Sequence, residues 1–211
     1  MARPALTRRR LLGIDRSGPP PQATLGEQPL RPWTIPNAIG FARLALIPVF
    51  LALALSSGDG RIASASVVYA VIGGSDYLDG LVARATGQYS RLGALLDPLT
   101  DRLLVISGVV VTWHFELLPR WALAILAARE LLMVVLTQAA LRHGLELGVN
   151  TLGRWAVWPT MFSLFLAMVS VTWVAEALLL GGLALTLAAT GLYLRDARRS
   201  LRAKGSPSSS T

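Results

Sequence analysis

Six long apolar stretches, separated by short polar connections, occupy most of the chain. They cover residues 38–55, 62–83, 93–115, 121–141, 155–174 and 177–194. Each approaches the ~20 residues that a helix needs to cross the hydrocarbon core of a bilayer. Because lipid offers no partners to backbone groups, the pattern predicts helices, the first beginning after Pro36-Asn37. Short connections favour antiparallel neighbours, so we expect an all-α integral membrane protein with a six-transmembrane-helix bundle.

Polar segments lie on either side of this apolar region. Residues 1–32 contain three consecutive arginines from Arg8 and three consecutive prolines from Pro19, and we expect a disordered cytoplasmic arm there. Residues 196–211 are basic and rich in serine, which predicts a cytoplasmic tail. The six-helix catalytic domain is therefore expected to extend over residues 33–195.

The composition supports a membrane protein and narrows the chemistry. Of the 211 residues, 53% are hydrophobic and 15% are charged, whereas soluble domains carry about 25% charged residues. The net charge is +8, and the cations lie between apolar runs, which favours anionic lipid over nucleic acid as their partner. The chain has no cysteine and two histidines, so disulfides, thiolate zinc sites and a Ser-His triad are disfavoured.

The distribution of basic residues predicts the orientation. If the N-terminus is cytoplasmic, fifteen of the twenty Lys and Arg residues fall on the inner side, and only Arg61 and Arg120 fall outside. Cytoplasmic segments of membrane proteins are enriched in Lys and Arg. We therefore expect a multi-pass protein of the cytoplasmic membrane with both termini in the cytoplasm.

Four aspartates stand within two of the apolar stretches. Asp76 and Asp79 are three residues apart near the inner end of the second predicted helix, and Asp97 and Asp101 are four apart near the start of the third. Each spacing places the two members of a pair on one helix face. A charge at the bilayer centre costs about 2.5–3.5 kcal/mol, so a cluster predicts a functional site. The connection places both pairs at one depth, where they can converge.

Converging carboxylates repel one another and need protons or cations. Oxygen ligands suit hard ions such as Mg²⁺, Mn²⁺ or Ca²⁺, and two divalent ions about 3.5–4 Å apart favour in-line attack at phosphorus. Gly80, Ala83 and Gly93 share the aspartate faces and leave room for a helix or a flat ligand. Arg84 can bind phosphate oxygens in bidentate fashion. The segment therefore predicts a metal-dependent site for a phosphate-containing ligand.

Two other interpretations use the same residues. In the first, the aspartates form buried ion networks with Arg43, Arg84, Arg102 and Arg129, although buried pairs add little stability. In the second, the carboxylates line a cation transport pathway. The acids cluster at one end of the predicted bundle, and no further acid continues the path outward.

The spacing of this segment resembles the signature of the CDP-alcohol phosphatidyltransferases. All eight defining positions match, and they are Asp76, Asp79, Gly80, Ala83, Arg84, Gly93, Asp97 and Asp101. Residues 34–37, Arg43 and Pro48 are similar to the opening of the family's first helix. Residues 92–104 and 128–130 resemble the branch that builds phosphatidylglycerophosphate and, in actinobacteria, cardiolipin. The resemblance covers about residues 34–194 and implies the family's six-helix fold and homodimeric state.

The resemblance also implies a reaction and roles. Family members transfer the phosphatidyl group of CDP-diacylglycerol to an alcohol in glycerophospholipid biosynthesis and release CMP. Asp101 would take the proton of the attacking hydroxyl. Two divalent cations, Mg²⁺ or Mn²⁺, would be held by Asp76, Asp79, Asp97 and Asp101. The CDP-lipid would be bound by Asp76, Gly80, Ala83, Arg84 and Gly93, with Gly80 and Ala83 lining the cytidine pocket.

The acceptor is a glycerol-type alcohol, for which several identities stay open. Glycerol 3-phosphate, giving phosphatidylglycerophosphate, is favoured as the commoner branch, and Arg129, Arg142 and Arg154 are candidate acceptor-binding cations. The fifth helix opens with Gly153-Arg154-Trp155 where phosphatidylglycerophosphate synthases usually carry Gly-Lys-x-Lys-Thr. This departure is closer to the actinobacterial cardiolipin-synthase-like branch, whose acceptor is phosphatidylglycerol. An inositol phosphate fits less well, because no further cation cluster is present.

Overall fold

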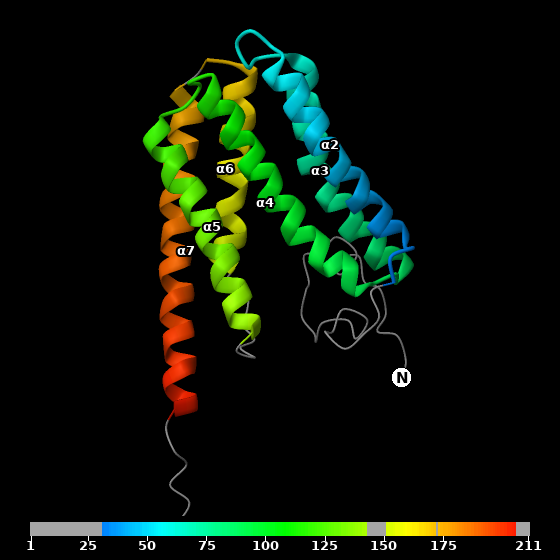
Figure 1. Ribbon diagram of the computed structural model, residues 1–211, viewed down its shortest axis with the longest axis vertical. Coiled ribbons are helices and arrows are strands. Elements are labelled where there is room, and N and C mark those ends of the chain that lie inside the picture. Colours follow the sequence, from blue (N-terminus) through cyan, green and yellow to red (C-terminus); the bar gives the residue numbers. More distant parts are fainter. Residues whose placement is uncertain (1–30, 143–150, 172, 206–211) are drawn as a thin grey trace, which may run out of the picture. The chain divides into compact units, whose positions relative to one another are not determined.

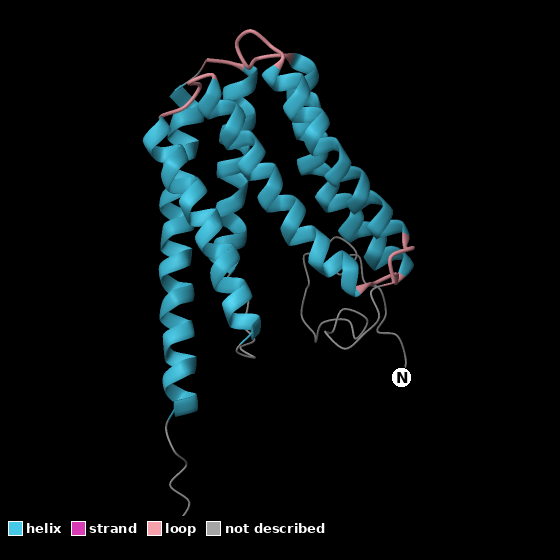
Figure 2. Ribbon diagram, viewed as in Figure 1, coloured by secondary structure: helices cyan, strands magenta, loops and turns pink. Residues whose placement is uncertain are grey.

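The computed structural model describes residues 31–142, 151–171 and 173–205, with side chains described except at 137–142, 151–156, 193 and 196–205. Within these ranges the chain consists of helices joined by loops (Figures 1 and 2). The helices are α2 (Ile35–Leu55), α3 (Ala63–Thr86), α4 (Arg91–His114), α5 (Arg120–Arg142), α6 (Thr151–Val169) and α7 (Trp173–Gly205). The all-helical fold is confirmed in this part of the chain. The predicted arm up to residue 30 and the last six residues lie outside the described residues.

The first helix begins earlier than the sequence predicted. The Thr34 Oγ1 accepts a hydrogen bond of 3.3 Å from the Asn37 backbone N–H, so Thr34 is the N-cap and α2 starts at Ile35. Pro36 therefore lies in the first turn, where its missing N–H leaves no helical hydrogen bond unmade. Our predicted start at residue 38 was therefore late by three residues.

The last two helices differ most from their predicted bounds. We expected them over 155–174 and 177–194, and the structure has α6 end at Val169 and α7 begin at Trp173. The residues around this turn are apolar on both sides, so hydropathy alone marks no boundary. Helix α7 continues to Gly205, into the segment predicted as a tail, because no glycine or proline interrupts residues 192–204.

Among the described residues, two helices are long and apolar enough to cross a membrane by length and composition. These are α2 and the first twenty residues of α7, Trp173–Leu192. Aspartates and arginines lower the hydropathy of α3 and α4, and the apolar part of α6 is shorter, Val157–Val169. Six helices are present in the described residues, while six crossings stay a prediction.

Contacts divide the chain into two compact units, and α4 contributes to both. The first unit comprises α2, α3 and α4 as far as Ser107. In it α2 packs along α3 (Figure 1), with the rings of Phe50 and Tyr69 centred 5.2 Å apart and Ile72 fully buried. The side chain of Arg43 is buried in the same unit, with 1% of its surface exposed. This buried charge is central to the candidate site.

The second unit contains residues 59–61, α4 from Gly108, and helices α5, α6 and α7. Helix α6 packs closely on α7, where the Ser163 Oγ donates a hydrogen bond of 2.7 Å to the Ala175 carbonyl. Gly182 lies against Thr160, and a Cβ at Gly182 would approach the Thr160 backbone nitrogen to 2.9 Å. The apolar core of this unit includes Val111, Leu123, Leu126, Leu164, Met168 and Leu179.

Candidate active site

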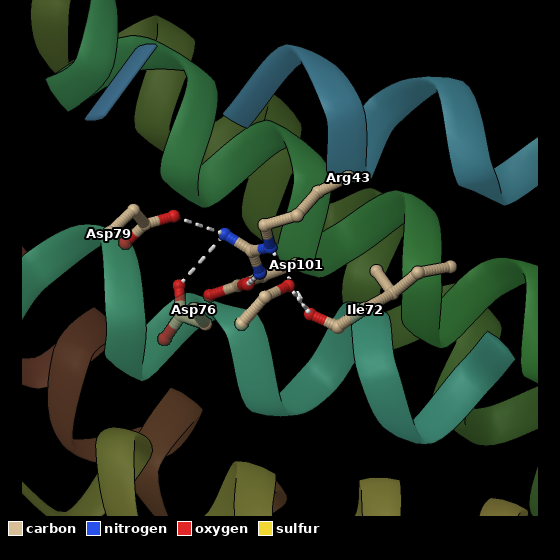
Figure 3. Close-up of polar contacts among 6 residues, drawn as sticks. Arg43, Ile72, Asp76, Asp79 and Asp101 are labelled. Atoms are coloured by element: carbon tan, nitrogen blue, oxygen red, sulfur yellow. Dashed lines mark hydrogen bonds and ion pairs between the residues drawn. The ribbon is translucent and has the colours of Figure 1, made fainter. Parts of the chain in front are cut away.

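Three of the four predicted aspartates converge on the guanidinium of Arg43 (Figure 3). The Arg43 Nη1 lies 3.1 Å from Asp76 Oδ1 and 3.0 Å from Asp79 Oδ2, and Nη2 lies 3.0 Å from Asp101 Oδ1. Asp76 and Asp79 come from α3, whereas Asp101 comes from α4. The predicted convergence of the two helices is therefore present, and Arg43 of α2 is at its centre.

The remaining contact of Arg43 is with the backbone. Its Nε donates a hydrogen bond of 3.1 Å to the Ile72 carbonyl, one turn before Asp76 on α3. A buried guanidinium needs both charge compensation and hydrogen-bond acceptors, and α3 and α4 supply both. The ion network that we weighed as an alternative is thus present for Arg43.

Three carboxylates contact one buried guanidinium and the fourth, Asp97, lines the adjoining cavity, so the ionised aspartates outnumber the charge of Arg43. The donor set is all oxygen, which suits hard divalent ions. The side chains of Asp76 and Asp101 are 45% and 40% exposed, so they are accessible to an ion. Within the described residues, however, no three acidic or histidine side chains are already arranged to hold one metal ion. The donors fit a divalent cation in chemistry, while Arg43 occupies the point at which they meet.

A cavity of about 170 Å³ opens next to the cluster in the first unit. Six of the eight motif positions line it, namely Asp79, Gly80, Ala83, Arg84, Gly93 and Asp97. A cavity of about 150 Å³ accommodates one benzene ring, so this space suits a single planar ring. The other two motif residues, Asp76 and Asp101, are joined to Asp79 through Arg43. The motif therefore forms one continuous site.

The start of α4 is fixed to the start of α2 by a short chain of hydrogen bonds. The Ser90 Oγ donates to Asn37 Oδ1 at 2.8 Å and accepts from the Gly93 backbone N–H at 2.9 Å. The Asn37 Nδ2 donates to the carbonyls of Arg31 and Pro32. A Cβ at Gly93 would lie 2.8 Å from Asn37 Oδ1. Gly93 thus permits close approach between helices, one of the two uses that the sequence suggested for it.

Gly80 and Arg84 lie one turn apart on α3 and contact each other. A Cβ at Gly80 would lie 3.2 Å from Arg84 Nη1, so the guanidinium rests against the bare backbone of the helix. Both residues line the cavity together with Asp79. A cation and a carboxylate are therefore presented to the same small space, as recognition of a phosphate beside a metal requires.

Of the three predicted acceptor-binding arginines, the structure describes the side chain of one. Arg129, on α5 in the second unit, pairs with Glu130, and its Nε donates to Thr190 Oγ1 at 3.1 Å. This pair differs from the ion network with the aspartates that we considered for Arg129. Arg142 ends α5 and Arg154 lies in the first turns of α6, and their side chains lie outside the described residues. Their role as acceptor contacts stays a prediction.

Sequence reasoning missed several residues of the site. Gly40, Gln88, Tyr89 and Ser90 line the cavity, and none of them was singled out. Gln88 also accepts a hydrogen bond of 3.1 Å from the Ile35 backbone N–H through its side-chain oxygen. The connection between α3 and α4 is short and polar, but nothing in its composition distinguishes a cavity wall from an ordinary loop.

Comparison with known proteins gives matches over most of the described chain. Residues 33–188 match the family described as CDP-alcohol phosphatidyltransferase. A cardiolipin synthase (CMP-forming) of Streptomyces coelicolor is 41% identical over 167 residues, or 76% of this chain and 77% of that protein. A CDP-diacylglycerol–glycerol-3-phosphate 3-phosphatidyltransferase of Bacillus subtilis is 28% identical over 62% of this chain and 74% of its own. A probable phosphatidylglycerophosphate synthase of Mycobacterium tuberculosis is 37% identical over 51% and 53% of the two chains.

Proposed function

Because the chain belongs to the CDP-alcohol phosphatidyltransferase family, we propose that it transfers the phosphatidyl group of CDP-diacylglycerol to phosphatidylglycerol, forming cardiolipin and CMP. The chain is an enzyme of the transferase class in phospholipid biosynthesis. In the reaction the acceptor oxygen bonds to the phosphorus that carries diacylglycerol, and the bond from that phosphorus to the CMP oxygen breaks. The observation that carries the proposal is the single site formed by all eight motif residues.

We assign the proton transfer to Asp101. Its Oδ1 accepts a hydrogen bond from Arg43, and 40% of the side chain is exposed, so an acceptor hydroxyl can reach the carboxylate. The proton of the attacking hydroxyl passes to this carboxylate as the new phosphorus–oxygen bond forms. The buried guanidinium fixes the position of the base by holding one of its oxygens.

The cavity beside the aspartates is the proposed nucleotide site. Its volume suits one planar ring, and Gly80 and Ala83 form a wall without bulky side chains. Arg84 lies against Gly80 at the same wall, where its guanidinium can bind a phosphate oxygen. These contacts favour an arrangement in which cytosine lies in the cavity and the diphosphate lies towards Asp79 and Asp97.

We further propose two divalent cations, Mg²⁺ or Mn²⁺, held by Asp76, Asp79, Asp97 and Asp101. The support is the all-oxygen donor set and its excess of negative charge over Arg43. Such ions, when bound, neutralise charge on the diphosphate and on the departing CMP. The chain's own contribution is to present carboxylates from two helices to the same region.

We also propose that the enzyme lies in the cytoplasmic membrane, crosses it six times and has both termini in the cytoplasm. Large apolar side chains stand exposed at four-residue spacing on several helices, and soluble proteins rarely expose such continuous apolar surface. The exposed pairs are Val67 and Val71 on α3, Leu95 and Leu99 on α4, Leu131 and Val135 on α5, and Trp158 and Phe162 on α6. Contact with acyl chains accounts for these stripes.

Phosphatidylglycerol is the acceptor that the comparisons favour over glycerol 3-phosphate. The Streptomyces relative named a cardiolipin synthase shares 41% identity, whereas the Bacillus relative named for glycerol 3-phosphate shares 28%. The Gly153-Arg154 opening of α6, with its single cation, agrees with that choice. Glycerol 3-phosphate, which we favoured from the sequence, becomes the second candidate, supported by the Bacillus and Mycobacterium relatives.

Product analysis with each acceptor tests the function. The purified full chain is incubated with CDP-diacylglycerol, Mg²⁺ and either phosphatidylglycerol or glycerol 3-phosphate, and lipids are separated by thin-layer chromatography while CMP is quantified. We expect one CMP per cardiolipin formed with phosphatidylglycerol and no lipid product with glycerol 3-phosphate. Asp101→Asn, which lacks the base but keeps the size of the side chain, is expected to lose turnover.

Two results would contradict this assignment. Phosphatidylglycerophosphate formed from glycerol 3-phosphate, with no cardiolipin from phosphatidylglycerol, would transfer the assignment to the second candidate. No CMP with any acceptor, together with cation flux through liposomes that contain the protein, would favour a transporter.

A further inference from the structure

We propose that Arg43 is an internal counter-cation of the aspartate cluster that competes with divalent ions for the same carboxylates. The inference rests on the proposed function in one respect, namely that the cluster binds divalent cations. It goes beyond that function by assigning to a residue of α2, outside the eight motif positions, control over how tightly the ions are held.

The contacts of Arg43 show that it substitutes for a bound cation. Its two terminal nitrogens lie 3.0–3.1 Å from one oxygen each of Asp76, Asp79 and Asp101. These carboxylates belong to two helices, and Arg43 belongs to a third. The guanidinium therefore bridges three of the four carboxylates that two metal ions are proposed to share (Figure 3).

Burial strengthens the charge interactions of Arg43 and Asp79. The Arg43 side chain is 1% exposed and Asp79 is 6% exposed, so neither charge has water to replace a lost partner. Opposite charges attract strongly in such surroundings, and like charges repel strongly. A divalent ion that binds Asp79 and Asp101 therefore shares these carboxylates with the guanidinium and meets its positive charge at short range.

Arg43 is thus a positioning residue whose effect should appear in metal affinity. Without a bound metal ion it offsets part of the repulsion among the three carboxylates that it contacts. In the metal-bound state it weakens binding, because part of the binding free energy is used to displace it. Removing the guanidinium should tighten metal binding while destabilising the metal-free protein, a combination that a purely structural role does not produce.

Equilibrium Mn²⁺ binding to the full chain in detergent, followed by electron paramagnetic resonance of free Mn²⁺, tests the inference without any turnover. For Arg43→Gln we expect a Kd about tenfold lower than for the unmodified protein, within the range of couplings between linked ligands. Arg43→Lys keeps a charge but cannot bridge three carboxylates at once, so we expect a smaller decrease. Mn²⁺ should also raise the Tm of Arg43→Gln more than that of the unmodified protein.

Arg120→Gln is the matched control. Arg120 pairs with Glu116 at 2.9 Å, both side chains are largely exposed, and both lie in the second unit. The variant loses the same charge without touching the aspartates, so its Mn²⁺ affinity should equal that of the unmodified protein.

The outcomes separate this inference from the proposed metal site. If the unmodified protein binds Mn²⁺ and both Arg43 variants bind it with equal or lower affinity, the competition is overturned while the metal site stands. If neither the unmodified protein nor any Arg43 variant binds Mn²⁺, the metal site itself fails and the competition fails with it. If Arg43→Gln is folded only when Mg²⁺ is present during purification, the ion has replaced the guanidinium and the inference is supported. If it stays unfolded even with Mg²⁺, the Mn²⁺ affinity of Arg43→Lys tests the inference. A Kd lower than that of the unmodified protein supports the competition, and an equal or higher Kd contradicts it.

Discussion

Polar side chains that reach from one helix to another hold the first unit together at its site end. Asn37 and Ser90 join the first turns of α2 and α4, and Arg43 joins α2 to both aspartate helices. Asn37, Ser90 and Arg43 each take part in more than one hydrogen bond, which fixes their positions. A small steric change at this point therefore cannot be absorbed without breaking a hydrogen bond.

Gly93→Ala should lower the stability of the protein. The new methyl group would lie 2.8 Å from Asn37 Oδ1 and 3.2 Å from Ser90 Oγ, and both atoms are held by hydrogen bonds. Overpacking of this kind typically costs about 1–3 kcal/mol. The change in the free energy of unfolding, measured by denaturant titration in detergent, checks it.

Gly74→Ala is the control for this variant. It lies in α3 of the same unit, and a Cβ there meets nothing within 4 Å. Because alanine favours a helix over glycine by about 0.5–1 kcal/mol, this variant should be as stable as the unmodified protein or more so. Equal unfolding free energies for the two variants would show that the contact at Gly93 is not close.

At the scale of helices, a glycine of α7 allows this helix to lie close to α6 in the second unit. Gly182 faces the backbone of Thr160, which is itself buried, and Ser163 donates to the Ala175 carbonyl across the same pair. The neighbouring Gly181 faces open space. Two adjacent glycines of one helix therefore have opposite surroundings, which gives a clean test of the packing.

Gly182→Ala should destabilise the protein, whereas Gly181→Ala should not. The Cβ at residue 182 would lie 2.5 Å from Thr160 Oγ1 and 2.9 Å from the Thr160 nitrogen, and a backbone atom cannot move aside as a flexible side chain can. We expect a loss of about 1–3 kcal/mol for Gly182→Ala and a slight gain for Gly181→Ala. Thermal unfolding of both variants measures the difference, and a lower Tm for Gly181→Ala than for Gly182→Ala would contradict the packing of α6 on α7.

The extent of the helices could be predicted from the sequence, but their lateral contacts could not. Apolar length and polar connections place α2 to α5 within a few residues, because both properties are local. The pairing of Arg43 with three aspartates depends on which faces of three helices meet, and residue spacing within one helix does not determine that. The aspartate spacing did predict convergence, because the connection between the two helices places both pairs at one depth. Gln88 and Tyr89 carried no comparable pattern.

At the scale of the molecule, charge and apolar surface are separated along the chain. Basic residues concentrate in the arms and in alternate connections, and exposed apolar stripes follow the helices between them. This separation is the basis for the proposed orientation, in which residues 56–62 face outward and residues 87–90 face the cytoplasm.

Labelling of single cysteines should establish this orientation, and the chain has no native cysteine to remove. Gly58 lies in the first connection and Ala85 in the last turn of α3, next to the second connection, and both are exposed. In intact cells from which the layers outside the cytoplasmic membrane have been removed, a membrane-impermeant maleimide should label Gly58→Cys without permeabilisation. It should label Ala85→Cys only after the membrane is permeabilised. The reverse pattern would invert the topology, and immediate labelling of both would argue against a crossing by α3.

The burial of Arg43 also sets an order for biogenesis. When α2 leaves the ribosome it carries a cation whose partners have not yet been synthesised, and placing such a charge in lipid costs about 2.5–3.5 kcal/mol. The Ile72 carbonyl, Asp76 and Asp79 arrive with α3, and Asp101 arrives with α4. The charge of Arg43 is therefore compensated once α3 has arrived, and its last hydrogen-bond acceptor comes with α4, so we expect these three segments to enter the bilayer as one cooperative group.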